Sequence, residues 1–438
     1  MKTFRHGGYV AGYKEATSQS IIRDIPIPEE VIIPVRQYAG EPCDPCVSVG
    51  EEVTPGQVIS RGLRFPAVCH ASVAGTVVAI TRCTEIGVGS VPAVHIKVQG
   101  DQGFNPLPCR VPLAMSPEEI LEAVVQAGIQ EDDSLGHPLY RRLMTAQTHR
   151  VSTLIINGME SEPYLTAQNR SLRERSALLI FGARAALRLT GAEQGVLALP
   201  GNEGELVQRY EELLADETVL RVVTLRNKYP QGDHNQLISS ITGREVAFGE
   251  LASTAGALVL EVSTLVALGE ALVSGKPMID CVITVSGPAA ESPGNYRVPV
   301  GTPIAHILKH CGIATGGERD VVWGGPMRGT VIDDLSIPIS KSCQGIVALP
   351  RQQTAHETGS FGECVNCARC VEQCPQRLYP NRLSIAAQSM AIKRMERYHV
   401  AACTECGLCN HVCPANRPIT QMIRAGKVAL TSSEGGES

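Results

Sequence analysis

The chain has 438 residues, of which 43% are hydrophobic and only 4% aromatic, and its formal net charge is −5. This composition predicts several packed cores and excludes a basic, aromatic-rich surface for nucleic acid. The sequence contains no run of about 18 apolar residues and no apolar signal segment after Met1, so we expect a cytoplasmic protein whose thiols stay reduced.

The first part of the chain predicts short strands separated by glycine and proline. Segments rich in β-branched residues cover 31–35, 57–60, 75–80 and 93–98. The phrases that begin at Val49 and His70 resemble the half-barrel repeats of lipoyl and biotinyl carrier domains, in which a lysine carries the cofactor. No lysine lies between Lys14 and Lys97. We therefore expect a barrel-sandwich domain, over residues 1–110, without a swinging arm.

From Ser116 the pattern changes to alternating helices and strands. Ser116 is a favourable N-cap, and Pro117 and the two glutamates after it suit the first helical turn. The expected elements are helices at 117–128, 176–189, 204–214 and 262–275 and strands at 152–156, 195–199 and 220–225. This alternation predicts a parallel, Rossmann-like α/β domain over residues 111–275.

The next segment returns to strands and turns. Strands are expected at 281–287 and 296–300, followed by a short helix at 304–311. Two strands followed by a helix suit a small β-grasp module, which we place at residues 276–350.

Two copies of the pattern C-x2-C-x2-C-x3-C-P lie near the C-terminus. Their cysteines are Cys364, Cys367, Cys370 and Cys374 in the first run and Cys403, Cys406, Cys409 and Cys413 in the second. This spacing is typical of [4Fe-4S] ligation, in which the fourth cysteine of one run binds the cluster of the other. A zinc ribbon would need separated C-x2-C pairs. We therefore expect a helical, two-cluster ferredoxin-like domain over residues 351–430.

The remaining cysteines are scattered. Cys43 and Cys46 form a lone C-x2-C, for which a reduced pair without a metal is the simpler interpretation and a redox or metal role the alternative.

An ordered set of phrases resembles the C subunit of the Rnf electron-transport complex over nearly the whole chain. The set includes Leu154-Ile-Ile-Asn-Gly-Met-Glu-Ser-Glu-Pro-Tyr-Leu, Lys228-Tyr-Pro-Gln-Gly and Gly324-Gly-Pro-Met, followed by both cysteine runs. The family's middle domain is similar to the flavin-bearing, NADH-oxidising subunit of respiratory complex I. The resemblance implies a route from NADH through FMN and two [4Fe-4S] clusters to a protein partner.

The resemblance also implies flavin-binding residues and a setting. Asn157, Glu160, Ser161 and Glu162 match positions where the family contacts FMN, although a turn after a strand favours the same polar residues. Rnf-type subunits lie peripheral to the inner membrane through partner subunits, and related proteins serve protein-shelled compartments. No residue is assigned as catalytic.

Three departures fall on the flavin side of this resemblance. Where the family has the loop G-x-G-G-A-G-F-P-T, residues 129–138 keep one glycine and gain Glu131, Asp132 and Asp133. A family Gly-Glu is replaced by Asp233-His234, and a family asparagine by Glu261. Glycine lets a backbone approach phosphate, whereas carboxylates repel it.

Two functions therefore remain open. The chain is either an electron-transfer subunit that takes electrons from NADH through FMN, and thus an NADH-dependent oxidoreductase, or a flavin-less electron-transfer or docking subunit fed by a partner protein. A third, purely structural role for the clusters is less compatible with two complete cysteine runs.

The missing hairpin lysine gives a direct test. We predict that intact-mass spectrometry of the purified, metal-free chain will give the mass of the sequence alone, because no lysine is available at the hairpin to carry a lipoyl or biotinyl group. A mass increment that matches either group would contradict this prediction.

Overall fold

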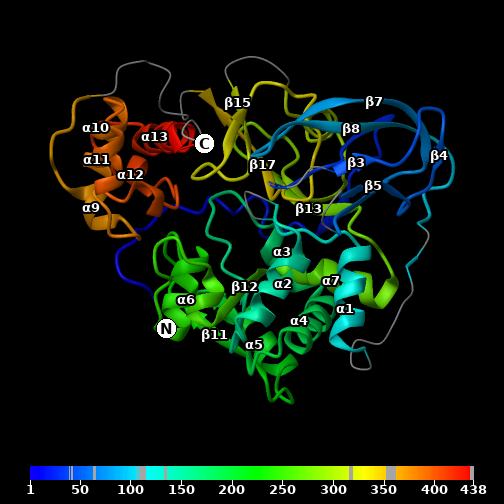
Figure 1. Ribbon diagram of the computed structural model, residues 1–438, viewed down its shortest axis with the longest axis horizontal. Helices are drawn as coiled ribbons and strands as arrows, with labels where there is room; N and C mark the ends of the chain where they lie inside the picture. The colour runs from blue at the N-terminus through cyan, green and yellow to red at the C-terminus, as the bar shows by residue number, and fades with distance from the viewer. Residues whose placement is uncertain are drawn as a thin grey trace.

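The computed structural model describes residues 1–438 except 39, 41–42, 63–65, 105, 108–114, 133–135, 315–318, 352–361 and 435–438, and except the side chains of 431–434. Figure 1 shows three regions: an α/β layer below, a barrel beside a mixed sheet at the upper right, and a group of short helices at the upper left. No helix in the described part of the chain is long and apolar enough to cross a membrane.

The barrel consists of two small antiparallel sheets, with strand orders β2-β8-β7-β4 and β3-β5-β6. Their bounds are β2 (Glu30–Pro34), β3 (Cys43–Pro45), β4 (Glu52–Val53), β5 (Val58–Gly62), β6 (Val68–His70), β7 (Gly75–Glu85) and β8 (Gly89–Val98). Alternate residues such as Val31, Ile33 and Ile96 point inward and share one core. The four strands expected from the sequence are all present.

The first 24 residues contact other parts of the molecule. Lys2 bridges to Leu225 and Gly8 to Tyr229. Strand β1 (Ile22–Asp24) then pairs in parallel with β14 (Gly294–Pro299) of the mixed sheet. This N-terminal segment therefore connects the α/β layer to the mixed sheet.

The α/β layer contains a parallel sheet with strand order β11-β10-β9-β12. Its strands are β9 (Thr153–Asn157), β10 (Gln194–Pro200), β11 (Leu220–Leu225) and β12 (Ala257–Glu261), and its helices are α1 (Pro117–Gln126), α2 (Leu139–Thr148), α3 (Ala167–Glu174), α4 (Ser176–Thr190), α5 (Gly204–Leu213), α6 (His234–Thr242), η2 (Ala252–Ala255) and α7 (Val262–Ser274). The sequence predicted α1, α4, α5 and α7 and missed α2, α3, α6 and β12. A full capping box at Ser116 and Glu119 begins α1.

The order of these strands creates a switch point between β9 and β12. The chain leaves β9 for β10 on one side, and β12 pairs with β9 on the other. In open parallel sheets, ligands bind outside the carboxyl ends of the strands at such a point. Asn157 and Glu261 end these two strands and lie opposite each other in register.

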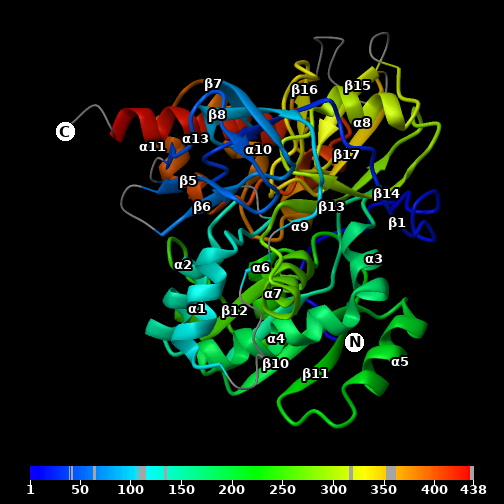
Figure 2. The same ribbon diagram turned by 90° about the vertical axis from the view of Figure 1, so that its right-hand side faces the viewer.

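The mixed sheet has six strands in the order β1-β14-β13-β17-β15-β16. Its remaining elements are β13 (Asp280–Ser286), α8 (Ile304–His310), β15 (Arg319–Trp323), β16 (Thr330–Ile332) and β17 (Gly345–Pro350). The strand–strand–helix order expected from the sequence is present as β13, β14 and α8. Figure 2 shows this sheet above α3.

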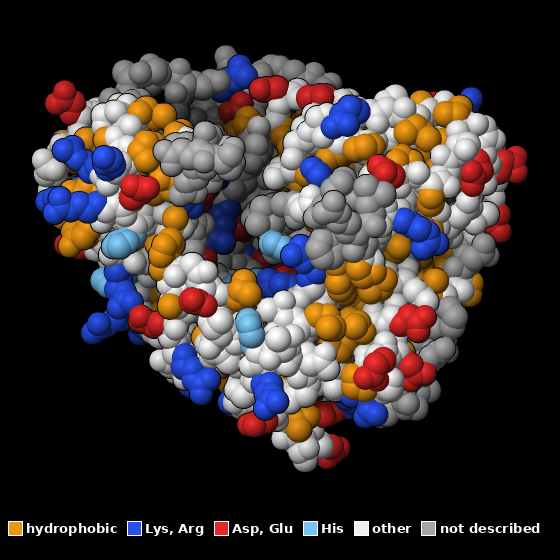
Figure 3. All heavy atoms as spheres, viewed as in Figure 1, with side chains coloured by type: hydrophobic (Ala, Val, Ile, Leu, Met, Phe, Trp, Pro, Cys, Tyr) orange, Lys and Arg blue, Asp and Glu red, His pale blue; other side chains and the backbone are white. Residues whose placement is uncertain are grey.

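The C-terminal region consists of short helices around the cysteine runs and of one longer helix, α13. They are α9 (Arg369–Gln373), α10 (Pro380–Gln388), α11 (Ile392–Arg397), η4 (Val400–Ala402), α12 (Leu408–His411) and α13 (Ile419–Glu434). Figure 3 shows a hollow between this region and the rest of the molecule, with basic, acidic and histidine side chains along it.

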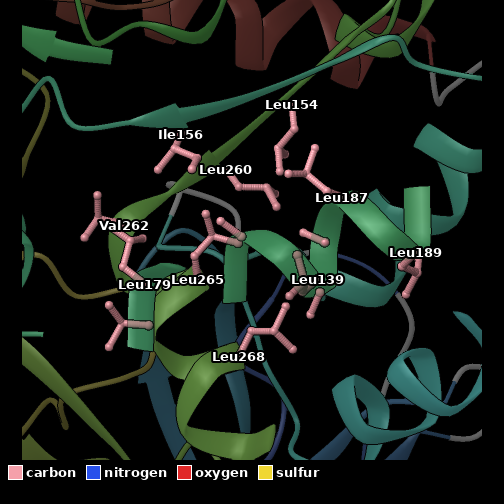
Figure 4. Packing of buried hydrophobic residues seen from close by; sticks show 14 of the residues in the cluster. Leu139, Leu154, Ile156, Leu179, Leu187, Leu189, Leu260, Val262, Leu265 and Leu268 are labelled. Atoms are coloured by element: carbon pink, nitrogen blue, oxygen red, sulfur yellow. The ribbon is translucent and has the colours of Figure 1, made fainter. Parts of the chain in front are cut away.

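The core of the α/β layer depends on the close approach of α4 and α7. Leu179, Leu187, Leu265 and Leu268 lie in the buried cluster shown in Figure 4. A Cβ at Gly182 of α4 would clash with the backbone carbonyl of Leu265 in α7. The two backbones can approach this closely only because the residue between them has no side chain.

We predict that Gly182→Ala destabilises the protein by about 1–3 kcal/mol, because overpacking outweighs the gain in helix propensity. Gly204→Ala at the start of α5 is the matched control, since a Cβ there meets no atom within 4 Å, and its effect should stay within about 1 kcal/mol. Chemical denaturation of both variants measures the difference. Equal effects would contradict the close-packing account.

Candidate functional site

The eight cysteines of the two runs line two cavities. One cavity, which we call proximal because Cys406 contacts Tyr229 of the α/β layer, is lined by Cys374, Cys403, Cys406 and Cys409. The other, which we call distal, is lined by Cys364, Cys367, Cys370 and Cys413. Each cavity thus combines three cysteines of one run with the last cysteine of the other, which is the crossed arrangement that the sequence suggested.

The two runs share one backbone pattern. In each run, residues with a positive φ occur two and four positions after the first cysteine and three positions after the last one. The equivalent residues of the two runs are Asn366 and Glu405, Ala368 and Gly407, and Arg377 and Asn416. The third cysteine of each run, Cys370 or Cys409, lies in a one-turn helix. The turns fold three thiols around one cavity and direct the fourth toward the other.

The chemistry of these donors fits a [4Fe-4S] cluster. Burial raises the pKa of the Cys406 thiol to about 12, so a cationic metal centre is needed to hold it as thiolate. The backbone N–H groups of Leu378 and Glu405 donate to the Sγ atoms of Cys374 and Cys403, at 3.4 Å each. Such N–H···S bonds tune the potential of a cluster.

The two cavities differ in exposure. Cys374 and Cys406 of the proximal cavity are buried, whereas Cys367 of the distal cavity is exposed. Cys370 of the distal cavity is also buried, so among the described residues this cavity reaches the surface at Cys367.

The proximal cavity is joined to the α/β layer through Tyr229. Its hydroxyl donates to the backbone oxygen of Cys406 at 2.6 Å and lies 3.1 Å from a carboxylate oxygen of Glu162. The other Glu162 oxygen accepts from the backbone N–H of Met327. Burial raises the pKa of Glu162, against the opposing charge of Arg328. These contacts fix the cysteine region against the edge of the parallel sheet.

At the switch point, the polar side chains bond to one another. Asn157 Nδ2 donates to Glu261 Oε1 at 2.8 Å and to the Gly232 carbonyl at 3.0 Å. His234 Nε2 lies 2.9 Å from the same Glu261 oxygen. Burial lowers the pKa of His234, but its hydrogen bond to Glu261 and the charge of that carboxylate outweigh burial, and the net pKa is raised.

The acidic residues of the altered loop lie in the same region. Glu131 is fully buried and pairs with Arg142 at 2.9 Å, and both charges act on the pKa of His234. Asp132 is 6% exposed and accepts a 2.6 Å hydrogen bond from Ser263 and one from Gln168. Asp133 lies outside the described residues.

The four residues predicted to contact flavin lie together after β9. Asn157 bonds Glu261, and Ser161 Oγ accepts from the Gly232 N–H at 2.8 Å. The Glu160 carboxylate accepts from the backbone N–H groups of Gln168 and Asn169 in the first turn of α3, and Glu162 contacts Tyr229 and Met327. Each already has an internal partner.

Sequence reasoning missed Tyr229, Arg142 and Arg328 as parts of this site. Tyr229 stands inside the quoted phrase Lys228-Tyr-Pro-Gln-Gly, which was a usable signal. Arg142 gave no such signal, because its role depends on the placement of α2 beside the altered loop.

Comparison with known proteins identifies the family. Residues 2–101 match the RnfC barrel sandwich hybrid domain, residues 124–270 the Nuo51 FMN-binding domain and residues 351–417 a 4Fe-4S dicluster domain. The C subunit of the proton-translocating ferredoxin:NAD(+) oxidoreductase complex of Clostridium ljungdahlii is 35% identical over 97% of this chain and 93% of its own length. The chain belongs to the RnfC family.

Other RnfC relatives are longer or of similar length. The C subunit of the Na(+)-translocating ferredoxin:NAD(+) oxidoreductase complex of Acetobacterium woodii is 31% identical, with 88% of this chain and 87% of that protein covered. The C subunit of the ion-translocating oxidoreductase complex of Pseudomonas aeruginosa is 32% identical over 98% of this chain, which spans only 56% of that protein.

A solved structure shares the fold. A chain of the NAD+-reducing [NiFe]-hydrogenase in the H2-reduced state aligns with a TM-score of 0.53 at 20% identity, covering 73% of this chain and 63% of the hydrogenase chain. Together, these matches confirm the predicted family, the barrel-sandwich domain, the electron-transfer role and, as domain types, the FMN-binding and two-cluster domains.

The residues at the switch point do not fit a flavin phosphate in the way that the family loop would. Three buried carboxylates, of Glu131, Asp132 and Glu261, gather at this edge of the sheet, and neighbouring guanidinium, hydroxyl and amide groups already bond to them. A phosphate placed there would meet like charges. We therefore assign no electron-transfer step to a flavin.

The raised pKa of His234 predicts a pH-dependent contribution to stability. The charged His234–Glu261 pair stabilises fully below the ordinary histidine pKa of 6.5, and this stabilisation is lost as pH rises through the raised folded-state pKa. Glu261→Gln keeps the acceptor for Asn157 and removes the charge. We expect it to cost about 1–3 kcal/mol at pH 6 and less at pH 9.

Anaerobic thermal unfolding at both pH values measures this change. Glu245→Gln is the control, because Glu245 pairs at the surface with Arg377 and not with a histidine, so its effect should not change between pH 6 and pH 9. An effect of Glu261→Gln that is the same at both pH values would contradict the pairing.

Proposed function

We propose that this chain is a peripheral electron-transfer subunit of a complex of the Rnf type, in which electrons pass through two [4Fe-4S] clusters. The observation that supports this proposal is the pair of cavities, each lined by three cysteines of one run and the last cysteine of the other. When bound, each cluster would supply a one-electron redox centre. Cys374, Cys403, Cys406 and Cys409 would hold the proximal cluster, and Cys364, Cys367, Cys370 and Cys413 the distal one.

The exposure of the cavities supports an order along this route. The distal cluster would exchange electrons with a partner protein, because Cys367 is exposed. The proximal cluster would communicate with the α/β layer, because Tyr229 and Glu162 connect the Cys406 backbone to it. The chain's own residues position the clusters and limit solvent access to the proximal one.

The finer fold assignments belong to the same proposal. We interpret residues 111–275 as a Rossmann-like domain, on the strength of the parallel sheet and its switch point, and residues 276–350 as a β-grasp module, on the strength of β13, β14 and α8. Residues 1–110 and 351–430 are the proposed limits of the barrel and cluster domains.

A second candidate is the route from NADH through FMN to the clusters. The match of residues 124–270 to the Nuo51 FMN-binding domain favours it, and Asn157, Glu160, Ser161 and Glu162 would then be its flavin contacts. The polar network at the switch point weighs against it.

The crossed ligation can be tested by iron analysis of anaerobically reconstituted protein, in which we expect about eight irons and eight sulfides per chain. Cys374→Ser should lose about one cube. Adding Cys403→Ser should cost little more iron, because both residues line the proximal cavity, whereas adding Cys364→Ser should remove the second cube as well.

The control is Cys46→Ser, which changes an exposed cysteine in the barrel and should retain both cubes. If the Cys374→Ser/Cys364→Ser double variant keeps about four irons, one cube's worth, both residues serve one cluster and the crossed arrangement is wrong. If the natural chain holds about four irons, the two-cluster proposal fails.

A further inference from the structure

The three departures from the family pattern converge in space, although they are far apart in the sequence. Glu131 follows α1, His234 begins α6 and Glu261 ends β12. The structure brings all three to the carboxyl edge of β9 and β12, where His234 contacts Glu261 and is close enough to Glu131 for that charge to affect its pKa. Substitutions that arose independently of one another would not be expected to lie in contact at one edge of the sheet.

Arg142 and His234 pair with two of the three carboxylates that meet here, Glu131 and Glu261. Arg142 contacts Glu131 and also donates from Nη2 to the Val259 carbonyl of β12 at 2.9 Å. His234 contacts Glu261, and Ser263 at the start of α7 donates to Asp132. Buried charges are tolerated when they are paired and hydrogen-bonded. Ion pairs and hydrogen bonds therefore hold these side chains together at the switch point, with Ser263 and Gln168 as the partners of Asp132; we call Glu131, Asp132, Arg142, His234 and Glu261 the closure set.

A flavin phosphate would have to displace these partners. It would add negative charge beside three carboxylates, and the backbone N–H groups of Gln130 and Glu131 already donate to Met278 Sδ and to the His137 carbonyl. Losing two charge-assisted hydrogen bonds weakens binding by roughly two to four orders of magnitude. Repulsion from the closure set would weaken it further.

We infer that the closure set has replaced FMN in this chain, and that the clusters exchange electrons with one-electron carrier proteins rather than with NADH. This inference rests on the proposed two-cluster function. The α/β layer then acts as a scaffold, because Tyr229 contacts both Glu162 and the Cys406 backbone and so holds the proximal cavity against this layer.

The electron balance follows from the cofactors. NADH releases a hydride, which carries two electrons, whereas each [4Fe-4S] cluster accepts one electron. A flavin can take the pair and release the electrons singly. Without it, the donor must itself be a one-electron carrier, such as a reduced iron–sulfur protein. One electron leaves the donor's cluster and enters a cluster of this chain. No covalent bond forms or breaks, and no proton is transferred.

The test uses the full chain, reconstituted anaerobically with both clusters and titrated with FMN while flavin fluorescence is recorded. We expect no saturable quenching up to about 100 μM FMN, because weakening the affinity by two or more orders of magnitude from a Kd of about 1 μM gives a Kd of about 100 μM or higher. One-to-one binding with a Kd at or below about 1 μM would overturn the inference.

A reversal variant tests whether the closure set is the cause. It combines Glu131→Gly, Asp132→Gly, Asp233→Gly, His234→Glu and Glu261→Asn, which return the positions toward the family pattern. Provided that it retains about eight irons, it should bind FMN at least tenfold more tightly than the natural chain. A variant with full iron content and unchanged affinity would contradict the assignment.

The matched control is Glu245→Gln, which removes an exposed carboxylate from the same domain and should leave FMN binding unchanged. The iron content distinguishes a failure of the two-cluster proposal from a failure of the inference about the closure set. Low iron in the natural chain means that the two-cluster proposal fails, whereas tight FMN binding at full iron means that only the closure inference fails.

Discussion

The arrangement of the α/β layer depends on one constraint: a carboxylate buried at the edge of a sheet needs a partner. Glu131 has Arg142, Glu261 has His234 and Asn157, and Asp132 has Ser263 and Gln168. These pairs link the loop after α1 to α2, α3 and α7, and they link β12 to β9 and α6. In open parallel sheets, ligands normally bind outside this edge, and here the edge holds the paired carboxylates instead of backbone groups alone.

The same constraint connects this edge to the clusters. Glu162 lies between the Tyr229 hydroxyl and the Met327 backbone, and Tyr229 reaches the Cys406 carbonyl. Glu162, which matches a flavin contact of the family, thus also helps to hold the cysteine region against the α/β layer. This double use explains how the phrase from Asn157 to Glu162 can persist in a chain whose phosphate loop has changed.

The cysteine spacing was sufficient to predict which thiols would meet, because [4Fe-4S] ligation imposes a strict local geometry. Periodicity and capping predicted α1, α4 and α7, but β12 was missed because its apolar run could not be distinguished from the helix that follows it. Glu131, His234 and Glu261 were recognised as departures, yet their pairing was not predicted, because the two carboxylates meet Arg142 and His234 only through tertiary packing. The sequence therefore identified the altered positions, and the fold revealed that they compensate one another.

The central claim is that electrons enter the clusters without a flavin. The most direct measurement is the absorbance of the reconstituted clusters under anaerobic conditions, after mixing with excess NADH and added FMN at one equivalent per chain, followed by a reduced one-electron carrier protein of low potential. The account predicts that NADH leaves the cluster absorbance unchanged and that the carrier bleaches it. Bleaching by NADH that requires the added FMN would contradict the account.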